Sequence, residues 1–381
     1  MRCSPERSAA VAAAALLGLC LPACTAGGAE TDRSDVESYQ KSLDATMEEL
    51  QREARRGEVS AQMELATRYY EGRFVEQDFE KAAEWYGAAA ERGIAEAYYS
   101  LGVMYEKGQG VVQDDRAAAK AYEVAAEAGV AQAENNLGFL YLEGRGVEQD
   151  DRTAFEWLDR AARHGVAASQ FVVGEMIAEG RVGQPDPEKA AQWYRLAADQ
   201  GFGIAQEELG RKYAAGDGVE RDLVVAAQWL ERAAVQGIVS AQAQLGALLA
   251  RGGPGLDRDP QGASEWLRLA ADAGEAAAQS NLGLLYLRGN GVDKDDAQAA
   301  RWFGRAAGQG MASAQFRLAT MFEYGRGVDK DLVQAMTWFE LAARSGARGA
   351  RERVEAIGVE LDAAARTRAL AAADAWEPTT E

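Results

Sequence analysis

The chain has 381 residues, a formal net charge of −19 and three cysteines. This acidity argues against binding to a nucleic-acid backbone and against electrostatic attachment to anionic lipid. The cysteines are Cys3, Cys20 and Cys24, all close to the N-terminus. Removal of a signal segment would leave one of them at most, which excludes an intrachain disulfide in the exported protein.

Residues 1–23 are predicted to be a signal peptide. Two arginines precede an apolar run over residues 9–22 that is short for a membrane span. The run ends in the letters LPAC, which resemble a bacterial lipobox with Cys24 as the lipidated residue. Thr25 replaces the Asp associated with inner-membrane retention, so lipidation would favour the outer membrane. Ordinary signal cleavage nearby, for example after Ala26, is the alternative.

Residues 24–57 are predicted to form a linker and an N-terminal capping helix. Ser34 and Glu37 have the spacing of a capping box at a helix start. An apolar stripe with helical spacing follows, made of Val36, Tyr39, Leu43, Met47, Leu50 and Ala54. We expect this stripe to cover the open face of the first of the repeated units described next.

Eight similar units fill residues 58–346, each closed by a glycine. The closing glycines are 36 residues apart except in the sixth unit, which has 37 because of an extra residue in loop 252–255. The unit boundaries are 58–93, 94–129, 130–165, 166–201, 202–237, 238–274, 275–310 and 311–346. A fixed period of this length indicates stacked supersecondary units that bury a continuous core only together.

Each unit is predicted to hold two helices. The first helix has Ala, Leu, Gly and Tyr on one face, as in Ala133, Leu137, Gly138 and Tyr141 of the third unit. A Gly-x-Gly sequence then ends that helix, because glycine tolerates the left-handed conformation of a helix end. Small residues in both helices allow close approach, and the large aromatic residues are expected to fill the seam between successive helix pairs.

The second helix is predicted to begin after an Asp that recurs in all eight units. These residues are Asp78, Asp114, Asp150, Asp186, Asp222, Asp259, Asp295 and Asp331. We interpret them as helix N-caps rather than catalytic acids. The same helix carries a Trp in seven units: Trp85, Trp157, Trp193, Trp229, Trp266, Trp302 and Trp338. The second unit instead has Ala121 with Tyr122 beside it.

The phased pattern resembles the Sel1-like repeat family, a relative of the tetratricopeptide repeats. In single letters it reads A…LG..Y..G.GV..D...A..W...AA..G, and it covers residues 58–346. The resemblance implies an all-α fold, a right-handed α-solenoid of eight helix-turn-helix repeats. Departures fall in the end units and in loops, namely Ala66, Phe74, the loop 182–185 and Ala319.

Residues 347–376 are predicted to form C-terminal capping helices, and residues 377–381 a tail. Residues 347–357 resemble a degenerate first helix of a further unit. Asp362 has the position of an N-cap for a last helix that would end near Trp376.

Residues with catalytic or metal-binding chemistry are scarce, and we predict no catalytic residue, metal site or cofactor. The single histidine, His164, precedes a closing glycine, where a helix dipole favours an imidazolium. Ser38 and Lys41 match Ser-x-x-Lys, but the chain lacks the Ser-Asp-Asn and Lys-Thr-Gly sequences that accompany it in penicillin-binding enzymes. The pair Asp257 and Asp259 begins like a calcium loop that lacks the closing Glu.

The first helices of related solenoids line the concave side, which is therefore the expected binding surface. The residues expected to bind a partner there are Met63, Tyr70, Tyr99, Glu106, Phe139, Phe171 and Glu175. Exposed aromatic residues are candidate anchors, and the acidic neighbours would favour a basic or amide-rich segment. The alternative is that several of these aromatic residues are partly buried between helix pairs.

The sequence thus predicts a non-enzymatic, monomeric periplasmic scaffold, held at the outer membrane only by a lipidated Cys24. Its expected partner is a protein or peptide of the cell envelope, not a nucleic acid. Family resemblance implies roles in envelope assembly, polysaccharide export or signalling. The alternative is a protein or enzyme that binds peptidoglycan or a β-lactam. Penicillin binding has been proposed for the cysteine-rich branch of Sel1-like proteins, whose cysteines this chain lacks.

Overall fold

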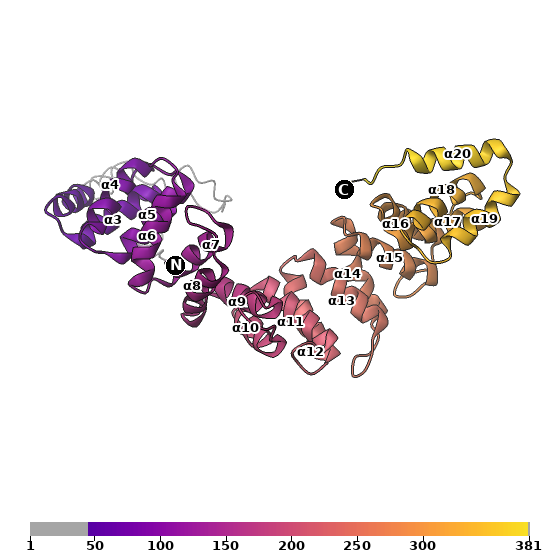
Figure 1. The fold of residues 1–381 in the computed structure, drawn as a ribbon, viewed down its shortest axis with the longest axis horizontal. Coiled ribbons are helices and arrows are strands. Elements are labelled where there is room, and N and C mark those ends of the chain that lie inside the picture. The colour runs from indigo at the N-terminus through magenta and orange to yellow at the C-terminus, as the bar shows by residue number, and fades with distance from the viewer. Residues whose placement is uncertain (1–44, 380–381) are drawn as a thin grey trace, which may run out of the picture. The chain divides into compact units, whose positions relative to one another are not determined.

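The computed structural model describes residues 45–379, which form paired helices joined by short turns (Figure 1). No strand occurs within this range, apart from an isolated bridge between Gly253 and Leu256. Contacts divide the chain into two compact units, residues 1–157 and 158–381. The predicted all-α solenoid is confirmed.

The first unit begins with a helix over residues 45–55. Two complete helix pairs and the first helix of a third pair follow it. Its helices are α3 (Val59–Glu71), α4 (Phe79–Ala90), α5 (Ala95–Lys107), α6 (Asp115–Glu127) and α7 (Ala131–Glu143). The division between the units falls inside α8 (Asp151–Arg163).

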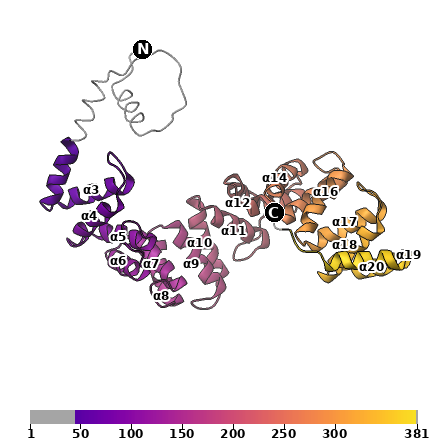
Figure 2. The same cartoon turned by 90° about the horizontal axis from the view of Figure 1, so that it is seen from above.

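The second unit continues the same alternation of first and second helices and ends with two further helices. Its helices are α9 (Ala167–Glu179), α10 (Pro187–Asp199), α11 (Gly203–Ala215), α12 (Leu223–Val235), α13 (Val239–Arg251), α14 (Pro260–Asp272), α15 (Ala276–Arg288), α16 (Asp296–Gly308), α17 (Ala312–Tyr324), α18 (Leu332–Arg344), α19 (Ala350–Glu360) and α20 (Ala363–Asp374). Each helix within a repeat lies antiparallel to its partner (Figures 1 and 2).

The recurring Asp caps the second helix of every repeat, as predicted. Its carboxylate accepts hydrogen bonds from backbone N–H groups of the first turn. For example, Asp222 Oδ1 accepts from the N–H groups of Val224 and Val225, at 2.9 and 3.0 Å. The other seven Asp residues make the same kind of bond. The N–H of Asp222 also donates to the carbonyl of Tyr213 at 3.0 Å, which ties the second helix to the first. Each cap is worth about 1 kcal/mol.

The residue that fills the space between paired helices is the one after the Trp. These residues are Tyr86, Tyr122, Leu158, Tyr194, Leu230, Leu267, Phe303 and Phe339, all buried. They explain the recurring glycine of the first helix. A Cβ on Gly102 would lie 2.5 Å from the Tyr122 ring, and one on Gly283 would lie 2.8 Å from the Phe303 ring. Real side chains do not approach this closely, so a Cβ at these two positions would force the ring to shift. The first and last repeats hold Ala66 and Ala319 at the same position.

The tryptophans lie at the seams between repeats but are less buried than expected. Trp157 packs against the cluster of α6 and α7, and Trp266 against that of α12 and α13. Only Trp229 among the seven is buried, at 7% exposure, whereas the others are half-buried. The neighbouring buried residue therefore carries more of the core than the Trp does.

The second glycine of the Gly-x-Gly turn is where one repeat contacts the preceding one. A Cβ on Gly146 would lie 2.2 Å from the backbone oxygen of Asp115, at the start of α6. The same contact recurs at Gly110, Gly218, Gly291 and Gly327. In the first repeat Phe74 replaces the second glycine and still adopts a left-handed φ of +64°.

A row of buried glutamines connects successive repeats in the second unit. The side-chain amides of Gln170, Gln206, Gln242, Gln279 and Gln315 donate to backbone carbonyls of the preceding second helix at 3.0–3.3 Å. In three of these repeats a second glutamine near the end of the repeat donates to the first, as Gln236 does to Gln206 at 2.7 Å. These bonds satisfy polar groups inside the seams.

Both ends of the array are covered by additional helices. Met47 and Ala54 of the initial helix pack on Ala61 and Leu65 of α3. The rest of the predicted N-terminal stripe, at Val36, Tyr39 and Leu43, lies outside the described residues.

At the other end, α19 and α20 pack on α18 (Figures 1 and 2). Thr337 Oγ1 donates to the Ala369 carbonyl at 3.2 Å, and the rings of Trp338 and Trp376 lie 6.5 Å apart. In the expected tail, the N–H of Thr379 donates to the Gly308 carbonyl at 2.8 Å.

Candidate functional site

A pocket of about 300 Å³ opens between the first two repeats of the first unit. It is lined by Tyr70 of α3, Tyr86 of α4 and four residues of α5: Tyr99, Ser100, Val103 and Lys107. The pocket therefore brings together Tyr70 and Tyr99, two of the residues that the sequence predicted to bind a partner.

Contacts behind the pocket hold the tyrosine rings in place. The hydroxyl of Tyr70 donates to Gln109 Oε1 at 3.0 Å, and that of Tyr86 lies 3.1 Å from Thr67 Oγ1. Desolvation, with smaller contributions from Tyr70 and Glu106, raises the pKa of Tyr99. Like an ordinary tyrosine, Tyr99 is protonated at neutral pH, and its hydroxyl can donate a hydrogen bond. Held aromatic rings with a polar tip are well suited to anchor a partner, because little side-chain entropy is lost.

The remaining apolar residues predicted to bind a partner, Met63, Phe139 and Phe171, are half-buried rather than freely exposed. Met63 packs against the cluster of α4 and α5, and Phe139 lies on α7 and does not line the pocket. In the second unit, the Phe171 ring lies 5.6 Å from that of Tyr194 and 5.7 Å from that of Phe202. These rings contribute to the packing and also leave part of their surface exposed. They are therefore partly buried between helix pairs, as the alternative interpretation expected, and partly available as anchors for a partner.

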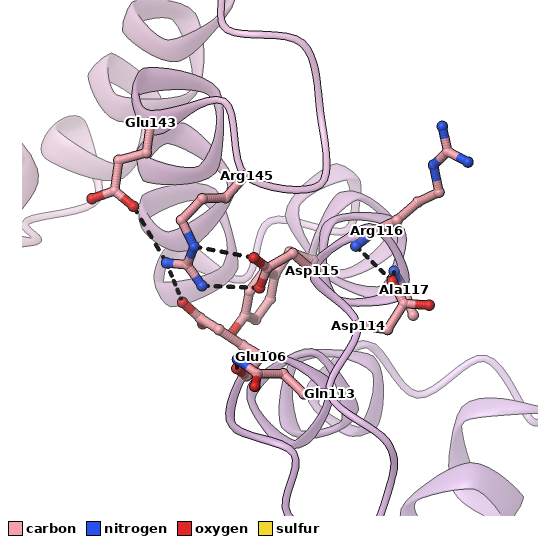
Figure 3. Close-up of polar contacts among 9 residues, drawn as sticks. Glu106, Gln113, Asp114, Asp115, Arg116, Ala117, Glu143 and Arg145 are labelled. Atoms are coloured by element: carbon pink, nitrogen blue, oxygen red, sulfur yellow. Dashed lines mark hydrogen bonds and ion pairs between the residues drawn. The ribbon is translucent and has the colours of Figure 1, made fainter.

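The two predicted acidic residues have different surroundings. Glu106 Oε1 lies 3.1 Å from Arg145 (Figure 3). Glu106 Oε2 accepts a hydrogen bond from the Tyr122 hydroxyl at 2.7 Å. In the second unit Glu175 is exposed, and its pKa is raised by desolvation and then by the charges of Glu179 and Glu208.

The carboxylate of Glu106 belongs to a network within the chain. Figure 3 shows Arg145 extending from the turn after α7 between Asp115, Glu143 and Glu106. Its nitrogens lie 2.9 Å from Asp115 and 3.3 Å from Glu143, and these hydrogen bonds, that to Asp115 first, raise the Arg145 pKa. Because Glu106 is paired in this way, it offers little free negative charge to attract a basic segment.

Lys107 gives the pocket a positive rim, which the sequence pattern did not reveal. Its side chain is exposed and makes no hydrogen bond or ion pair with any residue between 45 and 379. The residue type at the position of Lys107 differs from repeat to repeat, so the recurring sequence pattern does not include this lysine. The pocket thus combines tyrosine hydroxyls with one free cation.

Other predicted features lie elsewhere. His164 is exposed at the end of α8. Within residues 45–379, no group of three or more His, Cys, Asp and Glu side chains is placed to hold a metal ion. Every helix in the same range is too short or too polar to cross a bilayer. Cys24 lies outside the described residues.

The sequence matches the Sel1 repeat family in eight consecutive segments. They cover residues 59–94, 95–130, 131–166, 167–202, 203–238, 239–275, 276–311 and 312–346. Each segment begins one residue after the unit boundary assigned above. A search of curated proteins gives no match.

Two solved structures resemble the chain over nearly its whole length. One is c5321, described as a protective antigen present in uropathogenic Escherichia coli strains that displays an SLR fold. It is 32% identical over 98% of this chain and 76% of its own, with a TM-score of 0.75. The other is a Sel1 repeat protein from Oxalobacter formigenes, 29% identical over 91% of this chain and 99% of its own, with a TM-score of 0.59. Repeat spacing, helix pairing and these matches agree: the chain belongs to the Sel1-repeat family.

Proposed function

We propose that the protein is a non-enzymatic scaffold that captures a segment of a partner protein at the tyrosine pocket of the first unit. The observation that carries this proposal is the pocket itself, where three tyrosines from three successive helices surround about 300 Å³. A volume of that size accepts one large side chain of a partner. The chemistry offered is apolar ring surface and the hydroxyl of Tyr99, because the Tyr70 hydroxyl donates to Gln109 and that of Tyr86 is bonded to Thr67. No lining nucleophile is paired to a base.

The charge around the pocket favours a particular kind of segment. Lys107 is the free charge at the rim, while Glu106 is paired with Arg145. We therefore propose that the bound segment places an aromatic or aliphatic side chain in the pocket and a carboxylate or backbone carbonyl near Lys107. This differs from the basic segment that the sequence pattern favoured. A rim charge of this type affects the rate of encounter more than the final affinity.

We also propose that the scaffold works in the periplasm, attached to the outer membrane through Cys24. Support comes from the basic start, the short apolar run and the LPAC sequence at residues 21–24. In that setting a monomeric scaffold would act in envelope assembly, polysaccharide export or signalling.

The pocket can be tested by filling it. Ser100→Trp is expected to lower affinity for a partner isolated from envelope extract by at least about tenfold, as loss of an interface anchor does. Ser100 lines the pocket, and within residues 45–379 its hydroxyl donates only to the Glu96 carbonyl one turn earlier, so no core contact is removed. The matched control is Gln132→Trp, at an exposed position in the first turn of α7. Affinity is measured by titration calorimetry on the full chain.

Two results would count against this function. Wild-type affinity of Ser100→Trp, with unchanged helicity, would mean that the partner binds elsewhere. Covalent labelling of the purified protein by a tagged penicillin would instead support the enzymatic alternative related to the cysteine-rich branch.

The anchor is tested separately by Cys24→Ala. We expect this change to move the protein from the membrane fraction to the soluble periplasm, because the thiol that would carry the acyl chains is lost. Fractionation and intact-mass measurement of the mature chain check the result. An unmodified mature protein that begins after Cys24 would rule out the lipid anchor without affecting the pocket.

A further inference from the structure

A second pocket, of about 450 Å³, lies in the second unit at the last repeat. It is formed by the start of α17 and the turn that follows α18. Its lining residues are Ala312, Ser313, Phe316 and Arg317 from α17, and Ser345, Gly346, Ala347 and Arg348 from the turn.

Arg317 is the unusual member of this lining. Its Nε atom is buried and has no hydrogen-bond partner. No other hydrogen bond or ion pair joins it to the residues between 45 and 379. Its guanidinium carbon lies 5.9 Å from the centroid of the Phe303 ring. A buried donor without a partner costs free energy, and more so when it is charged. A ligand that accepts from Arg317 would remove this cost.

The charges around Arg317 add to its own instead of cancelling it. Desolvation, followed by the positive charge of Arg288, lowers its pKa. Arg348, exposed at the rim, makes no ion pair with any described residue. The first amides of α17 contribute the positive end of a helix dipole. The pocket therefore holds two arginines, Arg317 and Arg348, that have no carboxylate partner among residues 45–379, in a chain whose net charge is −19.

Neighbouring arginines show that this chain ordinarily pairs such groups. Arg344 bonds to Glu340 at 3.0 Å and to Asp374 at 2.6 Å, and Arg351 lies 2.9 Å from Glu340. The position of Arg317 is also special to the last repeat. The corresponding residues of the other repeats, in chain order, are Glu64, Ser100, Asn136, Val172, Glu208, Gln244 and Asn281. The last repeat is therefore the only one of the eight with a cationic side chain at this position.

We propose that this pocket binds an organic anion, namely a carboxylate joined to an apolar group. The guanidinium of Arg317 presents a planar set of donors that matches the two oxygens of a carboxylate. Arg348 at the rim adds a second positive charge. The hydroxyls of Ser313 and Ser345 are further donors on the same lining.

The apolar part of the ligand follows from the rest of the lining. Phe316, Ala312 and Ala347 offer no donor or acceptor from their side chains. The Phe316 ring is held by an edge-to-face contact with Phe339, at 5.1 Å between centroids, and so forms a fixed wall. Burial of a ring or alkyl group against this wall would distinguish the ligand from a small inorganic anion, which gains nothing there.

The test compares N-acetylphenylalanine, a carboxylate with an aromatic ring, with N-acetylphenylalanine amide, which lacks the charge. We expect the acid to bind the full chain in titrations followed by NMR, and the amide to bind at least about tenfold more weakly, as loss of a charge-assisted hydrogen bond predicts. Inorganic phosphate is expected to bind more weakly than the acid. Binding of the acid should weaken as salt is added.

Arg317→Met keeps an unbranched, flexible side chain but removes the guanidinium and its charge, and it should abolish preference for the acid over the amide. Because Arg317 also contacts Phe303, Arg348→Met provides a second variant at an exposed, unpaired position, expected to weaken the acid a few-fold. The control is Arg232→Met, which lies in another pocket of the same unit beside Glu231 and should change nothing.

Equal binding of acid and amide, or wild-type affinity in both pocket variants, would overturn the proposal. Tighter binding of phosphate than of the acid would overturn the apolar part of it. This site is in the second unit and does not depend on the tyrosine pocket.

Discussion

Tyr122→Ala is expected to destabilise the first unit by about 3–5 kcal/mol, the range for loss of a large buried ring. The ring of Tyr122 is fully buried and fills the space above Gly102, so its removal leaves a cavity between α5 and α6. The substitution also takes away the hydroxyl that donates to Glu106. Urea denaturation followed by circular dichroism measures the loss in the free energy of unfolding.

The matched variant Tyr122→Phe separates the ring from the hydroxyl. It keeps the packing and removes one hydrogen bond to a charged acceptor, worth about 1.5–3 kcal/mol. We therefore expect a smaller effect than that of Tyr122→Ala. If the alanine variant unfolds at the same urea concentration as wild type, the residue after the Trp is not the main core residue of its repeat.

Gly146→Ala should be far more damaging than Gly144→Ala, although the two glycines share a φ of +68°. A left-handed backbone costs an alanine roughly 1–2 kcal/mol at either position. A Cβ at residue 144 would lie 3.2 Å from the Gln149 Cβ and 3.6 Å from its backbone nitrogen, which need a shift of a few tenths of an ångström at most. A Cβ at residue 146 would lie 2.2 Å from the Asp115 carbonyl oxygen, so the turn must move away from α6. Such overpacking adds roughly 1–3 kcal/mol.

The same movement would displace Arg145, the residue before Gly146, from Asp115 and Glu106. Comparison of the unfolding free energies of the two variants isolates the contact between repeats, because the backbone strain is common to both. Equal losses for Gly144→Ala and Gly146→Ala would show that the second glycine serves only to end the turn.

The repeat architecture could be predicted from the sequence because its signal is local and phased. The Asp caps act on amides two and three residues away, so a recurring letter indicates both the helix start and the bond. The family resemblance rests on the same phased letters.

The core residue after the Trp was missed for a physical reason. Its position holds Tyr, Leu or Phe, which fill the same space with different shapes, so no single letter recurs there. The Trp does recur, so the sequence pattern pointed to it as the main core residue, although six of the seven Trp side chains are only half-buried.

The candidate site was less accessible to sequence reasoning because its chemistry depends on contacts between repeats. Glu106 looked like a free acid, but Arg145 reaches it from the turn of the next repeat. Lys107 and Arg317 each occur in a single repeat, so they are not part of the recurring sequence pattern. Tyr70 and Tyr99 were identified because aromatic residues on first helices stand out, but their pocket depends on how α3, α4 and α5 pack.

The row of glutamines has a consequence for how proteins of this kind change length during evolution. Gln236 bonds to Gln206 within one repeat, and Gln206 bonds to the carbonyl of Ala198 in the preceding repeat. Deletion of residues 202–237 would remove the first pair together and place Gln242 opposite the carbonyl of Ala198, which is chemically the same as its present acceptor, Ala234. A middle repeat can therefore be lost or duplicated without leaving a buried side-chain amide without its hydrogen-bond acceptor.

The first and last repeats differ, because the buried Oε1 atoms of Gln62 and Gln315 have no hydrogen-bond partner. Lineages should accordingly vary in the number of their middle repeats while keeping the two terminal ones.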